Sequence, residues 1–377
     1  MVHIIHFYIL DFKEGELMQK QIKNAIITIS FVLIIVITFI INVFSKDQEI
    51  SISERRKLAQ FPEITFSKIL NGNVITQWEK YVEDQFVQRD LFKKIKAFWS
   101  MKIFAQKDNN KLFEKDNAIY KMEYPLNENN VKKSAQKIQQ VYEKYLEGMN
   151  VYYSIIPDKN YYLENDDHLK IDFDKLQEIC QNEITDFKYI DLREGLKLED
   201  YYRTDLHWKQ ENLKDVVKII QNNMGLETTD INYDMQNKGK FYGTYYGQLA
   251  VNVLPDDLNI LTNETIENCN TYNYEKKASG QIYTETNSAD KYDIFVSGAT
   301  SLVSIENPNA KSDKELLLFR DSFGSSLAPL LVENYKKITL IDLRYISSTL
   351  LANYIEFKDQ DVLFIYSTTV LNQNILK

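Results

Sequence analysis

The chain has 377 residues, of which 44% are hydrophobic and 26% charged, a balance typical of a folded protein. Its net charge of -9 argues against nucleic acid as the main partner, because phosphate binding needs a basic face. With only Cys180, Cys269 and four histidines, the sequence offers no Cys/His metal cluster. We therefore expect no metal or other cofactor, and the two cysteines could form one disulfide.

An uncharged apolar segment covers residues 24–45 and reaches the roughly 20 residues needed to span a bilayer. Lysines lie on both sides of it, so the charge distribution alone does not set its orientation. No small-residue cleavage site follows Phe44, which favours an uncleaved anchor over a signal peptide.

The simplest topology places residues 1–23 in the cytoplasm, a single transmembrane helix at 24–45, and the remaining chain outside the cytoplasm at the cell membrane. Met18 is an alternative start, which would make residues 1–17 an over-extended reading frame.

Residues 46–130 are predicted to form a juxtamembrane helical arm. Apolar residues recur there at helical spacing, and they are Trp78, Tyr81, Val82, Phe86, Leu91, Ile95 and Phe98. Packing explains this pattern better than a binding site does.

Residues 131–377 alternate between short apolar runs and amphipathic segments. The strand candidates are 151–157, 189–193, 292–297, 315–320, 338–343 and 361–366. A helix is predicted over 209–224, with Gly225 as its C-terminal stop. β-branched runs separated by helices indicate an α/β domain with a mostly parallel sheet covered on both faces, and its ligands should bind at the carboxyl ends of the strands.

The stretch "YYRTDLHWKQ" at 201–210 contains one candidate site. Asp205 precedes His207 by two residues, and a histidine acting as general base needs a carboxylate to orient it. Only His168 and His207 follow the predicted membrane anchor, and His168 lies in an acidic, loop-like stretch, so His207 is the better candidate. The alternative is that Asp205 caps the next helix and His207 is an ordinary surface residue. Trp208 could line the site or anchor the loop by packing.

The second candidate is "LLLFRDSFGSSLAPLL" at 316–331, where an apolar strand turns sharply into an apolar helix at Ser322. A serine at this edge of the sheet can act as nucleophile, with backbone N–H groups of the helix start facing an oxyanion. Gly324 permits the tight turn, although the usual G-x-S-x-G elbow is absent. The alternative is a simple helix cap. Together, the two stretches supply every part of a Ser-His-Asp triad.

These residues also carry a family resemblance. "YYRTDLHWKQ" resembles the signature of the DHHW family, membrane-anchored extracytoplasmic proteins related to alginate O-acetylation proteins and SGNH hydrolases. Further blocks resemble the family in the same order, namely "ERRKLAQFPEITF", "YVEDQFVQRDLF", "FYGTYYGQLA", "YDIFVSG", "RDSFGSSLAPLL" and "ITLIDLRYI". The resemblance implies an SGNH-hydrolase-like, flavodoxin-like three-layer domain.

By this resemblance Ser322 would be the nucleophile, His207 the base and Asp205 the acid of the triad. The oxyanion or substrate candidates are the backbone N–H of Ser322 together with Phe323, Gly324, Arg344, Tyr345 and Trp208. The sequence departs from the pattern at three positions. Leu206 replaces the first histidine of the family name, Arg320 replaces the Gly of GDS, and Ala299 stands where a polar residue is expected.

The resemblance favours an extracytoplasmic O-acetyltransferase that acts on a secreted or cell-surface polysaccharide through an acetyl-serine intermediate. A membrane-bound O-acyltransferase would be the partner that supplies the acetyl group. Two alternatives stay open, a carbohydrate acetyl-esterase with the same triad and a non-catalytic component that binds or assembles polysaccharide.

Overall fold

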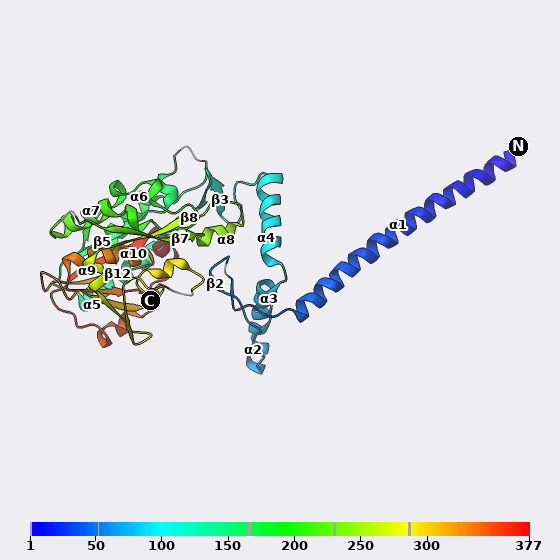
Figure 1. Cartoon of the computed structure of the whole chain (residues 1–377). Coiled ribbons are helices and arrows are strands. Elements are labelled where there is room, and N and C mark those ends of the chain that lie inside the picture. The colour runs from blue at the N-terminus through cyan, green and yellow to red at the C-terminus, as the bar shows by residue number, and fades with distance from the viewer. Residues whose placement is uncertain (1, 52, 165–166, 229–230, 286–287) are drawn as a thin grey trace. The chain divides into compact units, whose positions relative to one another are not determined.

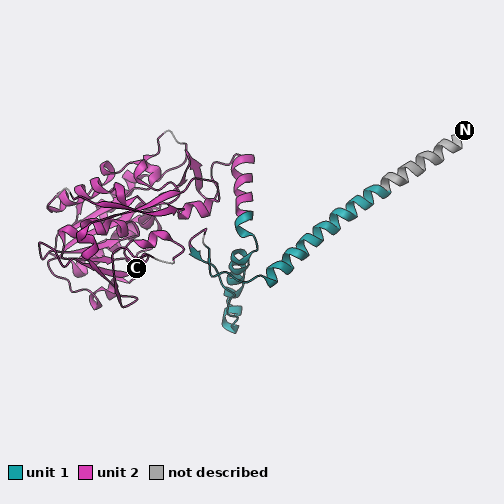
Figure 2. Ribbon diagram, in the orientation of Figure 1, with its two compact units in different colours: residues 1–51, 56–92 teal, residues 52–55, 93–377 magenta. Residues whose placement is uncertain are grey.

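A computed structural model gives the structure of residues 2–51, 53–164, 167–228, 231–285 and 288–377, and for residues 2–17 it describes the backbone alone. The chain divides into two compact units (Figure 2). Unit 1 contains residues 1–51 and 56–92, and unit 2 contains residues 52–55 and 93–377.

The described part of unit 1 contains a short strand pair and helices, one of which continues into unit 2. Its elements are α1 (Val2–Phe44), α2 (Phe66–Leu70), α3 (Asn73–Gln85), and the antiparallel strands β1 (Ile50–Ser51) and β2 (Arg56–Lys57). Within α1, the 27 residues Met18–Phe44 are long and apolar enough to cross a membrane. At about 1.5 Å per residue they extend over roughly 40 Å. By length and composition this helix is compatible with a membrane anchor or a signal sequence.

The segment predicted as a helical arm, 46–130, contains both helices and strands. Helix α4 (Arg89–Phe98) begins in unit 1 and ends in unit 2, followed by the π-helical turn η1 (Trp99–Ile103). Strands β3 (Leu112–Lys115) and β4 (Ala118–Lys121) then pair as an antiparallel hairpin. The role of 46–130 as a separate arm stays a prediction.

Unit 2 is organised around an eight-stranded sheet, counted over the described residues, with the strand order β10-β9-β11-β13-β12-β14-β5-β6. Two of its strands, β5 and β12, are labelled in Figure 1. The strands are β5 (Val151–Ile156), β6 (Lys188–Tyr189), β9 (Asn270–Asn273), β10 (Ala278–Gly280), β11 (Leu302–Glu306), β12 (Glu315–Arg320), β13 (Lys337–Ile341) and β14 (Asp361–Ser367). The five strands from β13 to β6 are parallel, and β11, β9 and β10 extend the sheet in antiparallel pairings. The predicted α/β class is confirmed.

Helices cover both faces of this sheet. They are α5 (Glu128–Tyr145), α6 (Phe173–Glu183), α7 (Lys214–Met224), α9 (Glu264–Asn268), α10 (Phe323–Leu327) and α11 (Thr368–Gln373). Alternate residues of β12 enter different cores: Leu317 and Phe319 pack with α5, α6 and α11, whereas Leu316 and Leu318 pack with α7, α9 and α10. A separate hairpin, β7 (Asp234–Phe241) and β8 (Asp256–Thr262), brackets the short helix α8 (Thr244–Leu249).

The two cysteines are both free and buried, Cys180 in the core on one face of the sheet and Cys269 in the core on the other. Burial raises the pKa of each thiol to about 12, so both behave as inert apolar side chains.

The prediction of a strand over 292–297 is wrong. The chain there forms a 3₁₀ turn, η6 (Lys291–Ile294), begun by an Asp290 side chain that accepts from the Tyr292 N–H. Val296, Ser297 and Gly298 follow with positive φ values of 47°, 64° and 70°, which no extended strand can adopt. The sheet strand lies just beyond, at β11. By contrast, the predicted helix end is confirmed, because α7 stops at Gly225 with φ 66°.

Candidate active site

Ser322 lies at the carboxyl end of β12, a central strand, and directly precedes α10. The buried carboxylate of Asp321 fixes this turn. Its Oδ1 accepts from the Phe323 N–H at 3.0 Å, and its Oδ2 accepts from the Ser367 N–H at 2.8 Å, at the end of neighbouring β14. The serine hydroxyl is therefore held at the edge of the sheet while its own side chain stays half-exposed.

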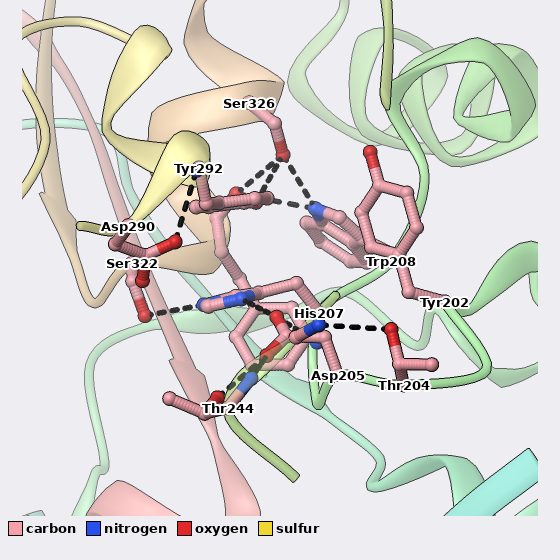
Figure 3. A network of polar contacts seen from close by, with 12 residues as sticks. Tyr202, Thr204, Asp205, His207, Trp208, Thr244, Asp290, Tyr292, Ser322 and Ser326 are labelled. Atoms are coloured by element: carbon pink, nitrogen blue, oxygen red, sulfur yellow. Dashed lines mark hydrogen bonds and ion pairs between the residues drawn. The ribbon is translucent and has the colours of Figure 1, made fainter. Parts of the chain in front are cut away.

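His207 joins Ser322 to Asp205 (Figure 3). Its Nε2 lies 2.7 Å from Ser322 Oγ, and its Nδ1 lies 2.6 Å from Asp205 Oδ2. An ionised carboxylate only accepts hydrogen bonds, so Nδ1 carries the proton that it donates to Asp205. The Nε2 lone pair is then free to accept the Ser322 hydroxyl proton, which is the arrangement of a nucleophile with its base.

The carboxylate of Asp205 is buried and fully engaged. Its Oδ1 accepts from the Thr244 N–H at 2.7 Å and from the Thr244 hydroxyl at 2.5 Å. Burial by itself raises the pKa of Asp205, but the His207 charge and hydrogen bond, Arg55 and the Thr244 hydroxyl outweigh it and hold the pKa well below its usual range. Gly243 makes this packing feasible, because a Cβ there would lie 2.1 Å from Asp205 Cβ.

A buried lysine anchors the loop that carries Asp205 and His207. The Lys159 ammonium donates to the backbone carbonyls of Tyr202, Arg203 and Asp205 at 2.8, 3.2 and 2.7 Å. Burial lowers the pKa of Lys159 to about 8, against the raising effect of nearby carboxylates. One side chain thus satisfies three carbonyls of the loop.

Tyr292 covers the histidine ring, and Trp208 fixes the loop that carries it. The Tyr292 ring stacks on the imidazole, with centroids 3.9 Å apart and 9° between the planes. Trp208 is fully buried, and its Nε1 donates to Ser326 Oγ at 2.9 Å and to the Phe323 carbonyl at 3.2 Å. Trp208 therefore anchors the loop by packing against α10.

The backbone N–H of Ser322 has no acceptor among the described residues, so it can face an oxyanion. The N–H groups of the other candidates donate within the fold. Phe323 and Gly324 donate to Asp321, and Arg344 and Tyr345 donate to Asp342. The Arg344 guanidinium also pairs with Asp342, at 2.7 Å, and the Tyr345 side chain is exposed. Substrate contacts by these four residues stay predictions.

The structure brings together the three predicted residues Ser322, His207 and Asp205, and it places His168 elsewhere, stacked on Phe113. Sequence reasoning missed Thr244, Tyr292 and Arg55, although each lies in or beside a block that carries the family resemblance. Among the described residues, no group of three His, Cys, Asp or Glu side chains is arranged to hold a metal ion.

Comparison with known proteins supports the resemblance. A family model described as DHHW protein matches residues 178–341, which include all three residues. A DHHW family protein from Eubacterium siraeum DSM 15702 aligns with TM-score 0.59 and 20% identity, over 71% of this chain and 95% of that chain. Bacillus cereus PatB1 aligns with TM-score 0.56 and 19% identity, over 71% of this chain and 99% of that chain.

A second structure of PatB1, with a sulfonyl adduct, aligns with TM-score 0.55 and 19% identity, over 71% of this chain and 98% of that chain. No curated protein matches the sequence. The chain thus resembles the DHHW family, and the expected SGNH-like α/β fold is confirmed.

Proposed function

We propose that this protein is a membrane-anchored, extracytoplasmic O-acetyltransferase that acts on a secreted or cell-surface polysaccharide. The observation that carries the proposal is the continuous hydrogen-bonded path from Ser322 Oγ through His207 to Asp205. The acetyl group, the polysaccharide acceptor and the membrane-bound acyltransferase partner come from the resemblance to the DHHW family and alginate O-acetylation proteins.

In the first half-reaction His207 Nε2 takes the proton of Ser322, and Oγ attacks the carbonyl carbon of an acetyl ester. The Ser322 N–H stabilises the developing oxyanion. Asp205 keeps the imidazole in the required tautomer and balances the imidazolium that forms. His207 then gives its proton to the leaving oxygen, which departs as an alcohol and leaves acetyl-Ser322.

In the second half-reaction a sugar hydroxyl takes the place of the departed alcohol. His207 removes the hydroxyl proton, the sugar oxygen attacks the acetyl carbonyl, and the proton returns to Ser322 Oγ as the serine leaves. Water in place of the sugar would make the protein an esterase, so the acceptor decides the outcome. The half-exposed position of Ser322 at the sheet edge suits a large acceptor.

The test uses the full chain in detergent with p-nitrophenyl acetate as acetyl donor, with and without an acetyl-free oligosaccharide, and mass spectrometry of the products. We expect acetylated oligosaccharide from the wild type and from Ser325→Ala, a nearby serine outside the path, and none from Ser322→Ala. Acetate release with no transfer to any oligosaccharide would identify an esterase. Equal inertness of wild type and Ser322→Ala would contradict both enzymes and favour a binding role.

A further inference from the structure

Residues 53–55 belong to the compact unit that carries the site, although residues on both sides of them belong to unit 1. Gly247 accommodates their close approach, because a Cβ there would lie 1.7 Å from the Ser53 carbonyl oxygen. Glu54 is buried and forms an ion pair with Lys93, whose ammonium also donates to the Gly247 carbonyl at 2.7 Å. The backbone at this point is therefore fixed by specific contacts.

These contacts direct the Arg55 side chain inward. The side chain is 5% exposed. Its guanidinium carbon lies 4.4 Å from the centroid of the Phe241 ring, and Nη1 donates to Asp290 Oδ1 at 2.6 Å. Arg55 has a φ of 53°, a left-handed conformation that is uncommon outside glycine. A strained backbone that delivers a buried cation into a site is typical of a functional position.

Asp290, the partner of Arg55, is connected to His207 through Tyr292. The same Oδ1 of Asp290 accepts from the Tyr292 N–H at 3.0 Å and so begins η6. The ring of Tyr292, held at its other end by a 2.8 Å hydrogen bond to Ser326 Oγ, stacks on His207. Asp290 and Tyr292 lie together beside Ser322 and His207 in Figure 3.

The charge of Arg55 also acts on Asp290. Burial and the nearby Asp205 raise the pKa of Asp290, whereas Arg55 acts to lower it. The cation thus favours the ionised form of Asp290, the form that accepts from both Arg55 and Tyr292.

We propose that Arg55 is a positioning residue of the active site, which holds Asp290 and, through it, the Tyr292 ring that fixes the His207 imidazole. This inference rests on the proposed function. It implies that a residue from the segment after α1 helps to order a site whose catalytic residues Ser322, His207 and Asp205 all lie beyond residue 200.

Kinetics on the full chain in detergent with p-nitrophenyl acetate provide one test. Arg55→Met should lower kcat about 10- to 100-fold, because a shift of about 1 Å in a catalytic group has that effect, while KM changes less than about twofold. Arg55→Lys, which keeps the charge, should recover most of kcat. The matched control is Arg56→Met, since Arg56 pairs with Asp84 in unit 1 instead. In an Asp290→Asn background, Arg55→Met should lower kcat little further, because the two residues act through the same contact.

A spectroscopic test separates this inference from the proposed function, because it needs no turnover. The stacked Tyr292 ring shifts the NMR signals of the His207 ring, which are identified by their loss in His207→Gln. In Arg55→Met these signals should move toward their positions in Tyr292→Leu, and in Arg56→Met they should not move. Wild-type signals in folded Arg55→Met would overturn the inference whatever the ester assay gives. An ester-inert wild type with the expected shifts would refute the proposed function alone.

Discussion

The Tyr292 ring lies parallel to the His207 imidazole, 3.9 Å from it between centroids, and its hydroxyl is bonded to Ser326 Oγ. One face of the imidazole is therefore covered by a ring that is fixed at both ends, because Asp290 also holds the Tyr292 backbone. The imidazole can rotate little, so its Nε2 stays directed at Ser322.

Substitutions of Tyr292 should separate the effect of the stacked ring from the effect of its hydroxyl. Tyr292→Phe keeps the stacked ring and should lower kcat less than about threefold, with a stability loss of about 1 kcal/mol from the lost hydrogen bond. Tyr292→Leu removes the ring and should lower kcat about 10-fold or more. Steady-state kinetics and thermal unfolding check both values. Equal rates for the two variants would show that stacking does not position the base.

Asp205 should matter for its charge, since a neutral amide of the same shape cannot hold the Nδ1–H tautomer of His207. Asp205→Asn is expected to lower kcat/KM about 10³- to 10⁴-fold. Thr244→Val, which removes one donor to Asp205 Oδ1, should lower it about 10-fold, whereas Thr244→Ser keeps the hydroxyl and should stay near wild type. An Asp205→Asn variant with wild-type kcat/KM would remove Asp205 from the mechanism.

Lys159→Met should damage both stability and rate, because three loop carbonyls lose their donor. We expect unfolding to become easier by about 2–4 kcal/mol, together with a fall in kcat. Lys240→Met is the control, since Lys240 is exposed and pairs with Asp257 at the surface. Denaturant unfolding of the full chain measures the difference. A Lys159→Met protein as stable and as active as the control would show that the loop needs no such anchor.

The buried carboxyl of Glu123 should make the stability of the folded chain depend on pH, independently of catalysis. Burial, followed by the nearby Asp158, raises the pKa of Glu123 to about 7, although its carboxylate accepts from the Thr368 hydroxyl at 2.7 Å. In the folded chain Glu123 therefore holds its proton between about pH 4.5 and 7, where the unfolded chain has lost it. Its contribution to stability is present at low pH and is lost as the pH rises through 7.

Glu123→Gln, which stays neutral at every pH, provides the comparison. The variant should gain stability relative to wild type as the pH rises from 4.5 to 8, by up to about 3 kcal/mol. Unfolding free energies measured at both pH values test this. A wild type that becomes more stable relative to Glu123→Gln over the same pH range would contradict the raised pKa of Glu123.

The sequence predicted the sheet best where strands are buried on both faces, as in β5, β12 and β14, because a continuous apolar run is then the signal. The same signal misled at 292–297, where the apolar side chains pack in a 3₁₀ turn followed by left-handed residues. Tertiary contacts decided that segment, and periodicity could not reveal them.

Ser322, His207 and Asp205 could be named from the sequence because histidines are few and the strand-to-helix turn has a local signature. Arg55 could not be named, because its partner Asp290 is 235 residues away in the sequence. It also belongs to residues 46–130, which were predicted to form a helical arm. Lys159 was equally hidden, since its partners are backbone carbonyls, which leave no trace in the sequence.

In the proposed mechanism Ser322 carries the acetyl group and His207 is its base. The most direct measurement is peptide mass spectrometry of the full chain after acid quenching from p-nitrophenyl acetate. We expect one acetyl group on the Ser322 peptide of the wild type, a lower level when oligosaccharide acceptor is present, and none in Ser322→Ala or His207→Ala. An unmodified Ser322 during wild-type turnover, or the same acetylation of Ser322 without His207, would contradict this mechanism.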